Sequence, residues 1–164
     1  MARNVVFIHS ANLMGAEDRL AQYISLIHES QFINFVDKIY IVNIGEDLVL
    51  KANLEKVEVI NSGQNLEVNE QYTLVYMYKW AKEHQDYNIL YLHTKGVGKD
   101  KIDAIEDWVS YMCYFLISKF DSCLRALETH VTVGVDLREA PMLHYSGNFW
   151  WARASHMTTV SYTH

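Results

Sequence analysis

The chain of 164 residues is poor in cysteine and proline and contains no long hydrophobic run. Its two cysteines, Cys113 and Cys123, are ten residues apart, a spacing that fits neither a zinc motif nor a redox CxxC pair. We therefore expect two reduced thiols in the core. The apolar stretches are far shorter than the ~20 residues that a membrane span needs, and residues 1–11 lack the features of a signal peptide. The sequence predicts a soluble, cytoplasmic protein with no membrane span.

Positive charge is also scarce. Lys and Arg together number 14 against 20 Asp and Glu, so the formal net charge is −6. Proteins that bind nucleic acid gather basic residues on one face, and we therefore expect no nucleic-acid partner. The seven glycines form neither GxGxxG nor a P-loop, which excludes the usual dinucleotide fingerprint and the Walker phosphate site. No HExxH spacing supports a zinc hydrolase.

The chain does contain short apolar segments that alternate with longer amphipathic ones. The expected strands are 4–9, 38–44, 57–60, 87–92, 132–137 and 145–152. The expected helices are 16–30, 66–84 and one or two over 102–128, with a break near 118–121. Strands that alternate with helices of more than about ten residues imply crossover connections and a largely parallel sheet. The sequence predicts one α/β domain over residues 1–164, with helices on both faces of a twisted, mostly parallel sheet.

Polar residues follow three of the expected strands. They are His9, Ser10, Ala11 and Asn12 after the first strand, Ser62, Gly63, Gln64 and Asn65 after the third, and His93, Thr94, Lys95 and Gly96 after the fourth. The carboxyl ends of parallel strands meet at one edge of a sheet, where α/β proteins bind their ligands. We expect these three clusters to line a single crevice.

Two motifs give the chain a family resemblance. Residues 91–96 read YLHTKG, and residues 144–152 read HYSGNFWWA. Together they resemble the glycosyltransferase-like proteins of bacterial capsules and large DNA viruses such as chlorella viruses, within the GT-A fold. The resemblance covers nearly the whole chain in topology, but only these two motifs are specific. It implies transfer of a sugar from a UDP- or GDP-sugar, a nucleoside-diphosphate sugar, to a hydroxyl of a glycan or glycoprotein acceptor.

Typical GT-A enzymes place an Asp-x-Asp pair at the end of the fourth strand, where it holds a divalent ion against the diphosphate. Here that position carries His93, Thr94 and Lys95. In one mechanism Lys95 supplies the positive charge, His93 donates a hydrogen bond or proton, and no metal is required. In the other, His93 binds Mg²⁺ or Mn²⁺ together with Asp136 or His144. A charged lysine repels a cation, which favours the first mechanism.

The resemblance also assigns the remaining candidates. Beside the diphosphate residues His93, Thr94, Lys95 and Gly96, it places His144, Ser146, Gly147 and Asn148 at the donor sugar, and the clusters 9–12 and 62–65 at the nucleoside. If the transfer inverts the anomeric configuration, a carboxylate must take the proton of the acceptor hydroxyl, and Asp136 is the candidate, ahead of Glu139 and Asp107. Related proteins continue further with an acceptor-side region, which we expect this chain, ending at His164, to lack.

Two other functions stay open at this point. One is a catalytically silent module that binds sugar nucleotides, which the absence of an acidic pair permits. The other is a flavodoxin- or Rossmann-like domain that binds a different phosphorylated ligand, because three polar strand ends do not by themselves specify a sugar. The sequence alone does not distinguish these alternatives.

Overall fold

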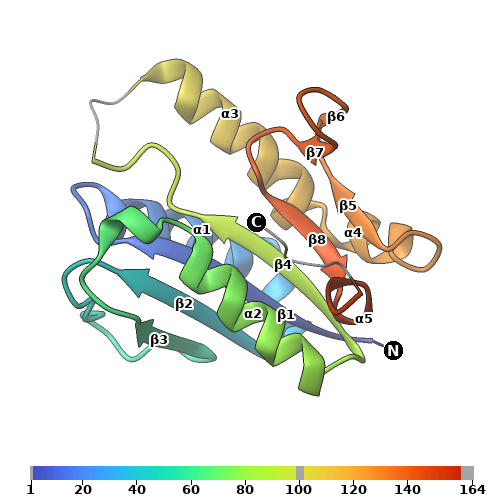
Figure 1. Cartoon of the computed structure of the whole chain (residues 1–164), viewed down its shortest axis with the longest axis horizontal. Helices are drawn as coiled ribbons and strands as arrows, with labels where there is room; N and C mark the ends of the chain where they lie inside the picture. Colours follow the sequence, from blue (N-terminus) through green and yellow to red (C-terminus); the bar gives the residue numbers. More distant parts are fainter. Residues whose placement is uncertain (1, 99–101, 160–164) are drawn as a thin grey trace.

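The computed structural model describes residues 2–98 and 102–159, which form a six-stranded sheet with helices on both faces (Figure 1). The strands of this sheet are β1 (Arg3–Ala11), β2 (Lys38–Ile44), β3 (Val57–Asn61), β4 (Tyr87–His93), β5 (Thr132–Gly134) and β8 (Trp150–Arg153). Their order is β3-β2-β1-β4-β8-β5. The first four are mutually parallel, and β8 runs antiparallel to both β4 and β5. The predicted α/β class and mostly parallel sheet are confirmed.

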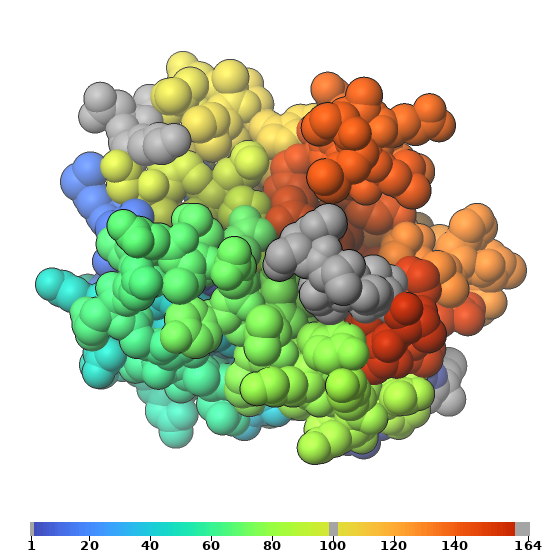
Figure 2. Space-filling view, viewed as in Figure 1, coloured from blue at the N-terminus to red at the C-terminus, as the bar shows by residue number. Residues whose placement is uncertain are grey.

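Alternation along the strands divides the core into two layers, since successive side chains point to opposite faces. In β1, Val6 and Ile8 face one layer, whereas Val5 and Phe7 face the other. The first layer is covered by α1 (Ala16–Glu29), α3 (Asp103–Cys113), the π-helical turn η3 (Tyr114–Ser118) and α4 (Phe120–Ala126). The second is covered by α2 (Gln71–Glu83) and α5 (Ala154–Met157), and Figure 2 shows α2, in green, packed over this face. In the part of the chain that the structure describes, no helix is long and apolar enough to cross a membrane.

The connections reverse direction between β1 and β4. From β1 the chain proceeds outward through β2 and β3, and it then returns to place β4 on the other side of β1. Such a switch point leaves a crevice at the carboxyl ends of the two central strands. His9 and His93 are partners in the β1–β4 register at that edge. The edge that the polar clusters predicted is therefore the edge with the switch point.

Three predicted elements are interrupted by residues with positive φ. The expected helix 66–84 divides into the 3₁₀ turn η2 (Leu66–Val68) and α2, because Asn69 adopts φ 47° and ψ −132° between them. The expected strand 132–137 ends at Gly134, since Asp136 has φ 50°. A small separate sheet follows, made of β6 (Leu137–Arg138) and β7 (His144–Tyr145). These backbone conformations cannot continue a helix or a strand.

The expected strand 145–152 also proved to be two elements. Gly147 and Asn148 have φ 82° and 57°, so the Ser-Gly-Asn segment forms a turn between β7 and β8. The predicted break near 118–121 is confirmed, because Lys119 separates η3 from α4. The short 3₁₀ turn η1 (Phe32–Asn34) completes the elements of the described residues.

Trp151 and the two cysteines belong to the layer under α3 and η3. Trp151 is fully buried, its Nε1 donates to the Leu116 carbonyl at 2.9 Å, and its ring lies 5.4 Å from that of Phe32. Cys113 and Cys123 are buried free thiols, as predicted. Burial raises the pKa of Cys113 to about 12 and that of Cys123 to about 11, so neither is a reactive thiolate at neutral pH.

We expect Trp151→Phe to lower the free energy of unfolding by about 2–3 kcal/mol, because it leaves a cavity and removes the donor to the Leu116 carbonyl. Tyr114→Phe, which removes a polar tip from an exposed ring on η3, should change it by less than about 0.5 kcal/mol. Urea denaturation followed by circular dichroism measures both. Equal effects of the two substitutions would contradict the structural role of Trp151.

Candidate functional site

His9 lies two residues before the end of β1, at the switch point, and is almost completely buried. Its Nδ1 lies 2.8 Å from Oγ1 of Thr73, a residue of α2 that is also buried. Burial is the main cause that lowers the pKa of His9 to about 4, and it outweighs the attraction of Glu70. His9 is therefore neutral at pH 7, and it ties β1 to α2 beneath the edge.

His93 closes β4 beside His9, with a ring that contacts the second motif. Its Nε2 lies 3.0 Å from the carbonyl oxygen of Gly147. A carbonyl oxygen only accepts hydrogen bonds, so Nε2 carries the proton. Burial lowers the pKa of His93, and Lys95 acts in the same direction, against the opposing effects of Glu70 and the Gly147 carbonyl. The neutral ring thus presents an unprotonated Nδ1, 3.8 Å from Oε1 of Glu70.

Glu70 connects the two motifs and is a site residue that no sequence motif marks. It immediately precedes α2. Its Oε2 accepts hydrogen bonds from Tyr91 Oη at 3.0 Å and from Asn148 Nδ2 at 2.6 Å, while Oε1 faces His93. Asn148 Oδ1 in turn accepts from Nε1 of Trp150 at 3.0 Å. One carboxylate therefore holds β4 and the turn before β8 together.

Lys95 lies just beyond the end of β4. Its backbone N–H donates to the His93 carbonyl at 2.8 Å, which forms a tight turn, and the residue is half-buried. Within residues 2–98 and 102–159, the Lys95 ammonium has no hydrogen bond or ion pair. Thr94 is buried and its Oγ1 accepts from the Ala11 backbone N–H at 3.4 Å, so it joins β1 to β4. Of the two side chains, the lysine is the one available to a ligand.

Behind the HTKG loop lies a charge pair that sequence reasoning also missed. Arg19 of α1 is buried, and its guanidinium binds Glu106 of α3 through contacts of 3.1 and 2.5 Å. A Cβ at Gly96, whose φ is 79°, would lie 2.9 Å from the Ile105 side chain and 3.9 Å from Arg19 Nη2. The pair joins α1 to α3 and supports the loop from behind. From the sequence alone, an arginine in a helix is expected on the surface, because its partner, here 87 residues away, is not apparent.

Gly147 is enclosed by α3. A Cβ there would lie 2.4 Å from Met112 Sδ and 2.6 Å from Trp108 Nε1. Any larger residue would push the turn away from α3 and displace the carbonyl that His93 binds. Ser146, next to it, donates its backbone N–H to the Asp136 carbonyl at 3.0 Å. The predicted donor-sugar residues Ser146, Gly147 and Asn148 thus lie at the same edge as His93.

Asp136 and His144 have partners of their own. Both side-chain contacts of Asp136 are with Arg138, at 2.8 Å to Nη2 and 2.9 Å to Nε. His144 Nδ1 donates to the Met142 carbonyl at 2.7 Å. In the described residues, no group of three or more His, Cys, Asp or Glu side chains is arranged to hold a metal ion. The structure thus shows no preformed ligand set made of His93, Asp136 and His144.

The predicted nucleoside residues lie in β1 and in the loops that follow β1 and β3. Ser10 and Ala11 belong to β1 itself, and Ser10 Oγ is fully buried without a partner in the part of the chain described. Asn12 Nδ2 donates to the Glu46 carbonyl at 3.0 Å. In the second cluster, the Ser62 N–H donates to the Asn43 carbonyl, and the Gly63 carbonyl accepts from the Gly45 N–H. Gln64 is exposed. Asn65 Oδ1 accepts from the Glu67 N–H and so caps η2. These contacts place the second cluster three strands away from His93.

We expect Glu70→Gln to lower the pKa of His93 further, because the carboxylate favours the charged ring. Histidine resonances in a pH titration by NMR report this pKa directly. Glu67→Gln is the matched control, since Glu67 is an exposed carboxylate three residues away in η2, and it should leave the titration unchanged. An unchanged or raised pKa in the Glu70 variant would remove Glu70 from the site.

His9 should make the protein less stable as the pH falls. The unfolded chain takes up a proton near pH 6.5, whereas the folded protein does so only near pH 4, so stability is complete above about 6.5 and declines toward about 4. The difference corresponds to roughly 3 kcal/mol. Urea denaturation across this range should show a steeper decline for the wild type than for His9→Gln. Because carboxylates titrate equally in both proteins, parallel curves would contradict a buried neutral His9.

Of the comparisons with known proteins, a family model gave a match. A search of curated proteins found no match to the chain. The family model matches residues 4–161, which include both motifs and all the strands, apart from Arg3 at the start of β1. The chain therefore belongs to the family described as Domain of unknown function (DUF8361).

Proposed function

We propose that this protein is a glycosyltransferase that moves a sugar from a UDP- or GDP-sugar to a hydroxyl of a glycan acceptor. The observation that carries the proposal is the edge at the β1–β4 switch point. There a half-buried Lys95, which has no counter-ion among the described residues, follows His93, and the Gly147–Asn148 turn of the second motif lies against the same histidine. The architecture alone would not specify a sugar; the support comes from the two motifs meeting at one site.

Lys95 is assigned to the diphosphate. The pyrophosphate leaving group develops negative charge as the glycosidic bond breaks, and a fixed cation beside it lowers the barrier. An ammonium without a protein partner is free to bind phosphate oxygens through charge-assisted hydrogen bonds. His93 directs its only ring proton at Gly147, so its role in this proposal is to position the turn beside the donor sugar.

A divalent ion would neutralise the same diphosphate, and GT-A enzymes generally use one. The donor set here does not fit Mg²⁺ or Mn²⁺, which prefer several oxygen ligands. Lys95 stands where a carboxylate would be needed, and Asp136 is engaged by Arg138. In this proposal Lys95 neutralises the charge of the diphosphate, and no step involves a metal.

Glu70 and Asp136 are two carboxylic acids next to the second motif. Both oxygens of Glu70 already have protein neighbours, which makes it a positioning group for Asn148 and His93. Asp136 follows β5, which runs in the same direction as β4 and ends at the same edge. Its side chain is 35% exposed, so it remains the candidate base, with Arg138 as the group that orients it.

The strand order bears on the other ligand classes. Flavodoxin-like domains have the order 2-1-3-4-5, in which the first and third strands are neighbours. Here β1 lies between β2 and β4, and β3 is at the edge of the sheet. Strands β3-β2-β1-β4 share the Rossmann order, but β8 is antiparallel and the GxGxxG loop is missing. A sugar nucleotide agrees better with these features than FMN or NAD.

We expect Lys95→Ala to weaken the binding of UDP or GDP by about 10- to 100-fold, the loss of one charge-assisted contact to phosphate. Isothermal titration calorimetry measures it. Lys82→Ala is the control, because Lys82 lies on α2 with its ammonium over the Tyr78 ring, and it should leave the affinity unchanged. Equal affinities for wild type and the Lys95 variant would refute the diphosphate role.

Turnover separates an enzyme from a silent binding module. Purified protein incubated with radiolabelled UDP- or GDP-sugars should release the nucleoside diphosphate, and Asp136→Asn should reduce that release while donor affinity is kept. Donor binding with no hydrolysis or transfer to any glycan acceptor would favour the module. Absence of binding to every donor in the series would remove the transferase proposal.

A further inference from the structure

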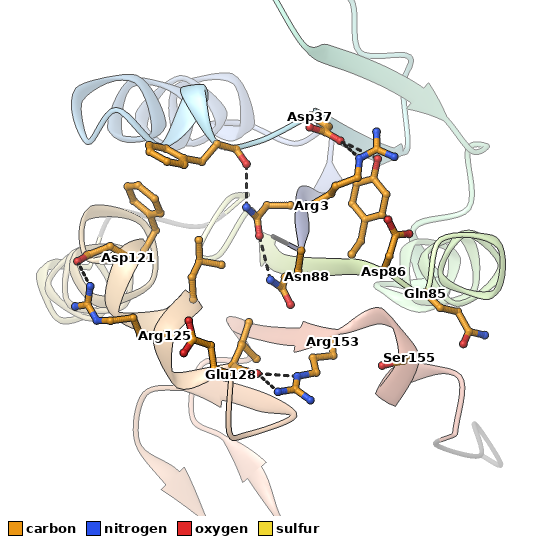
Figure 3. A pocket seen from close by; sticks show the side chains of 17 residues that line it. Arg3, Asp37, Gln85, Asp86, Asn88, Asp121, Arg125, Glu128, Arg153 and Ser155 are labelled. Carbon is orange, nitrogen blue, oxygen red and sulfur yellow. Dashed lines mark hydrogen bonds and ion pairs between the residues drawn. The ribbon is translucent and has the colours of Figure 1, made fainter.

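A cavity of about 840 Å³ opens at the opposite edge of the sheet, where β1 and β4 begin (Figure 3). Its walls come from the first residues of these strands, the last residue of β8, the segment before β2, and α4. Asn88 and His93 are five positions apart along β4, a distance of about 17 Å in an extended strand. The cavity is therefore distinct from the proposed transfer site. Its volume lies within the range of small-ligand sites.

The floor of this cavity is a pair of buried amides. Asn4 and Asn88 are 5% and 8% exposed. Asn4 Nδ2 donates to the Phe35 carbonyl at 2.9 Å, and Asn88 Nδ2 donates to Asn4 Oδ1 at 3.2 Å. Asn88 Oδ1 has no partner within residues 2–98 and 102–159, and Figure 3 shows the Asn88 amide facing the cavity. A buried amide oxygen that faces a cavity without a protein partner can accept a hydrogen bond from a ligand.

Beside the amides, Arg153 of β8 supplies a donor, because it is the register partner of Asn88, and Phe35 supplies an exposed ring. Arg153 Nε and Nη2 both donate to the Leu127 carbonyl, so the guanidinium is fixed while Nη1 is left for a ligand (Figure 3). Phe35 is 54% exposed and packs against Phe120 with ring centroids 5.3 Å apart. The cavity thus combines a fixed acceptor, a fixed donor and an accessible aromatic face.

The charges around the cavity disfavour an anion. The lining contains four acidic side chains and three arginines, an excess of one negative charge. They are Asp37, Asp86, Asp121, Glu128, Arg3, Arg125 and Arg153. Arg3 is already paired with Asp37 at 2.7 Å, and Arg125 with Asp121 at 2.9 Å. The ligand that fits is neutral, with hydroxyls that both donate and accept and with an apolar face for the ring, which is the chemistry of a saccharide.

We propose that this cavity binds a neutral sugar unit of a glycan, at a site separate from that of the nucleotide sugar. Asn88 Oδ1 accepts from a sugar hydroxyl, Arg153 Nη1 donates to a neighbouring one, and the Phe35 ring packs on the C–H face. The site performs no chemistry. It holds a glycan on the protein, whether or not that glycan is the acceptor.

Saturation-transfer NMR on the whole chain tests this with the methyl glycosides of glucose, galactose, mannose and N-acetylglucosamine. At least one should receive saturation from the protein. Phe35→Ala and Asn88→Leu should each weaken its binding by tenfold or more, and circular dichroism verifies that both variants fold. Phe35 is half-exposed, so its replacement keeps the test decisive if the Asn88 variant does not fold. Lys95→Ala, at the other edge, should leave glycoside binding unchanged.

Three outcomes overturn the proposal: no binding of any of the four glycosides, binding that survives both cavity variants, or displacement of the bound glycoside by inorganic phosphate. A concentration-dependent dimer that Phe35→Ala abolishes would instead assign the cavity to self-association. Calorimetry with UDP and GDP keeps the two proposals separate, because the Phe35 variant should bind nucleotide as the wild type does. Failure at one edge of the sheet therefore leaves the other proposal standing.

Discussion

The carboxylate of Glu70 is the interaction on which the candidate site depends. It receives the Tyr91 hydroxyl and the Asn148 amide on one oxygen and faces His93 with the other. Through these contacts the start of α2, the end of β4 and the turn before β8 keep one arrangement. The His93–Gly147 hydrogen bond closes the same ring of contacts from the opposite side. Without this acid, the two sequence motifs would be joined at this edge only by the His93–Gly147 hydrogen bond and by the pairing of β4 with β8.

Burial determines which side chains are charged at the carboxyl ends of β1 and β4. Burial keeps both His9 and His93 neutral at pH 7, so neither adds positive charge near Lys95. The lysine is then the cation closest to the end of β4 that has no protein partner among the described residues, in a chain whose net charge is −6. Arg19, a buried cation close to this loop, is neutralised by Glu106 behind it. Within residues 2–98 and 102–159, an anionic ligand at the end of β4 therefore meets the unpaired ammonium of Lys95, whose position the strand end determines.

Much of the framework follows from local patterns in the sequence, whereas the site contacts do not. Strand 38–44 was predicted to the residue, because its apolar run is bounded by polar residues and Gly45. The interruptions at Asn69, Asp136 and Asn148 were not predicted, since positive φ at a residue other than glycine depends on tertiary contacts. Glu70 and Arg19 were missed for the same reason: their partners are 21 to 87 residues away. The cavity at the amino edge joins segments that no sequence motif connects.

The antiparallel direction of β8 has a consequence for how the molecule transmits force. Its first residue adjoins the Gly147–Asn148 turn, and its last, Arg153, lies in the cavity at the far edge. The four residues of β8 thus form a short strut between the turn and the cavity, and backbone hydrogen bonds pair this strut with β4 on one side and β5 on the other. Slippage of this strut along its axis would disturb both ends at once. A load applied at either end is therefore shared with the neighbouring strands β4 and β5.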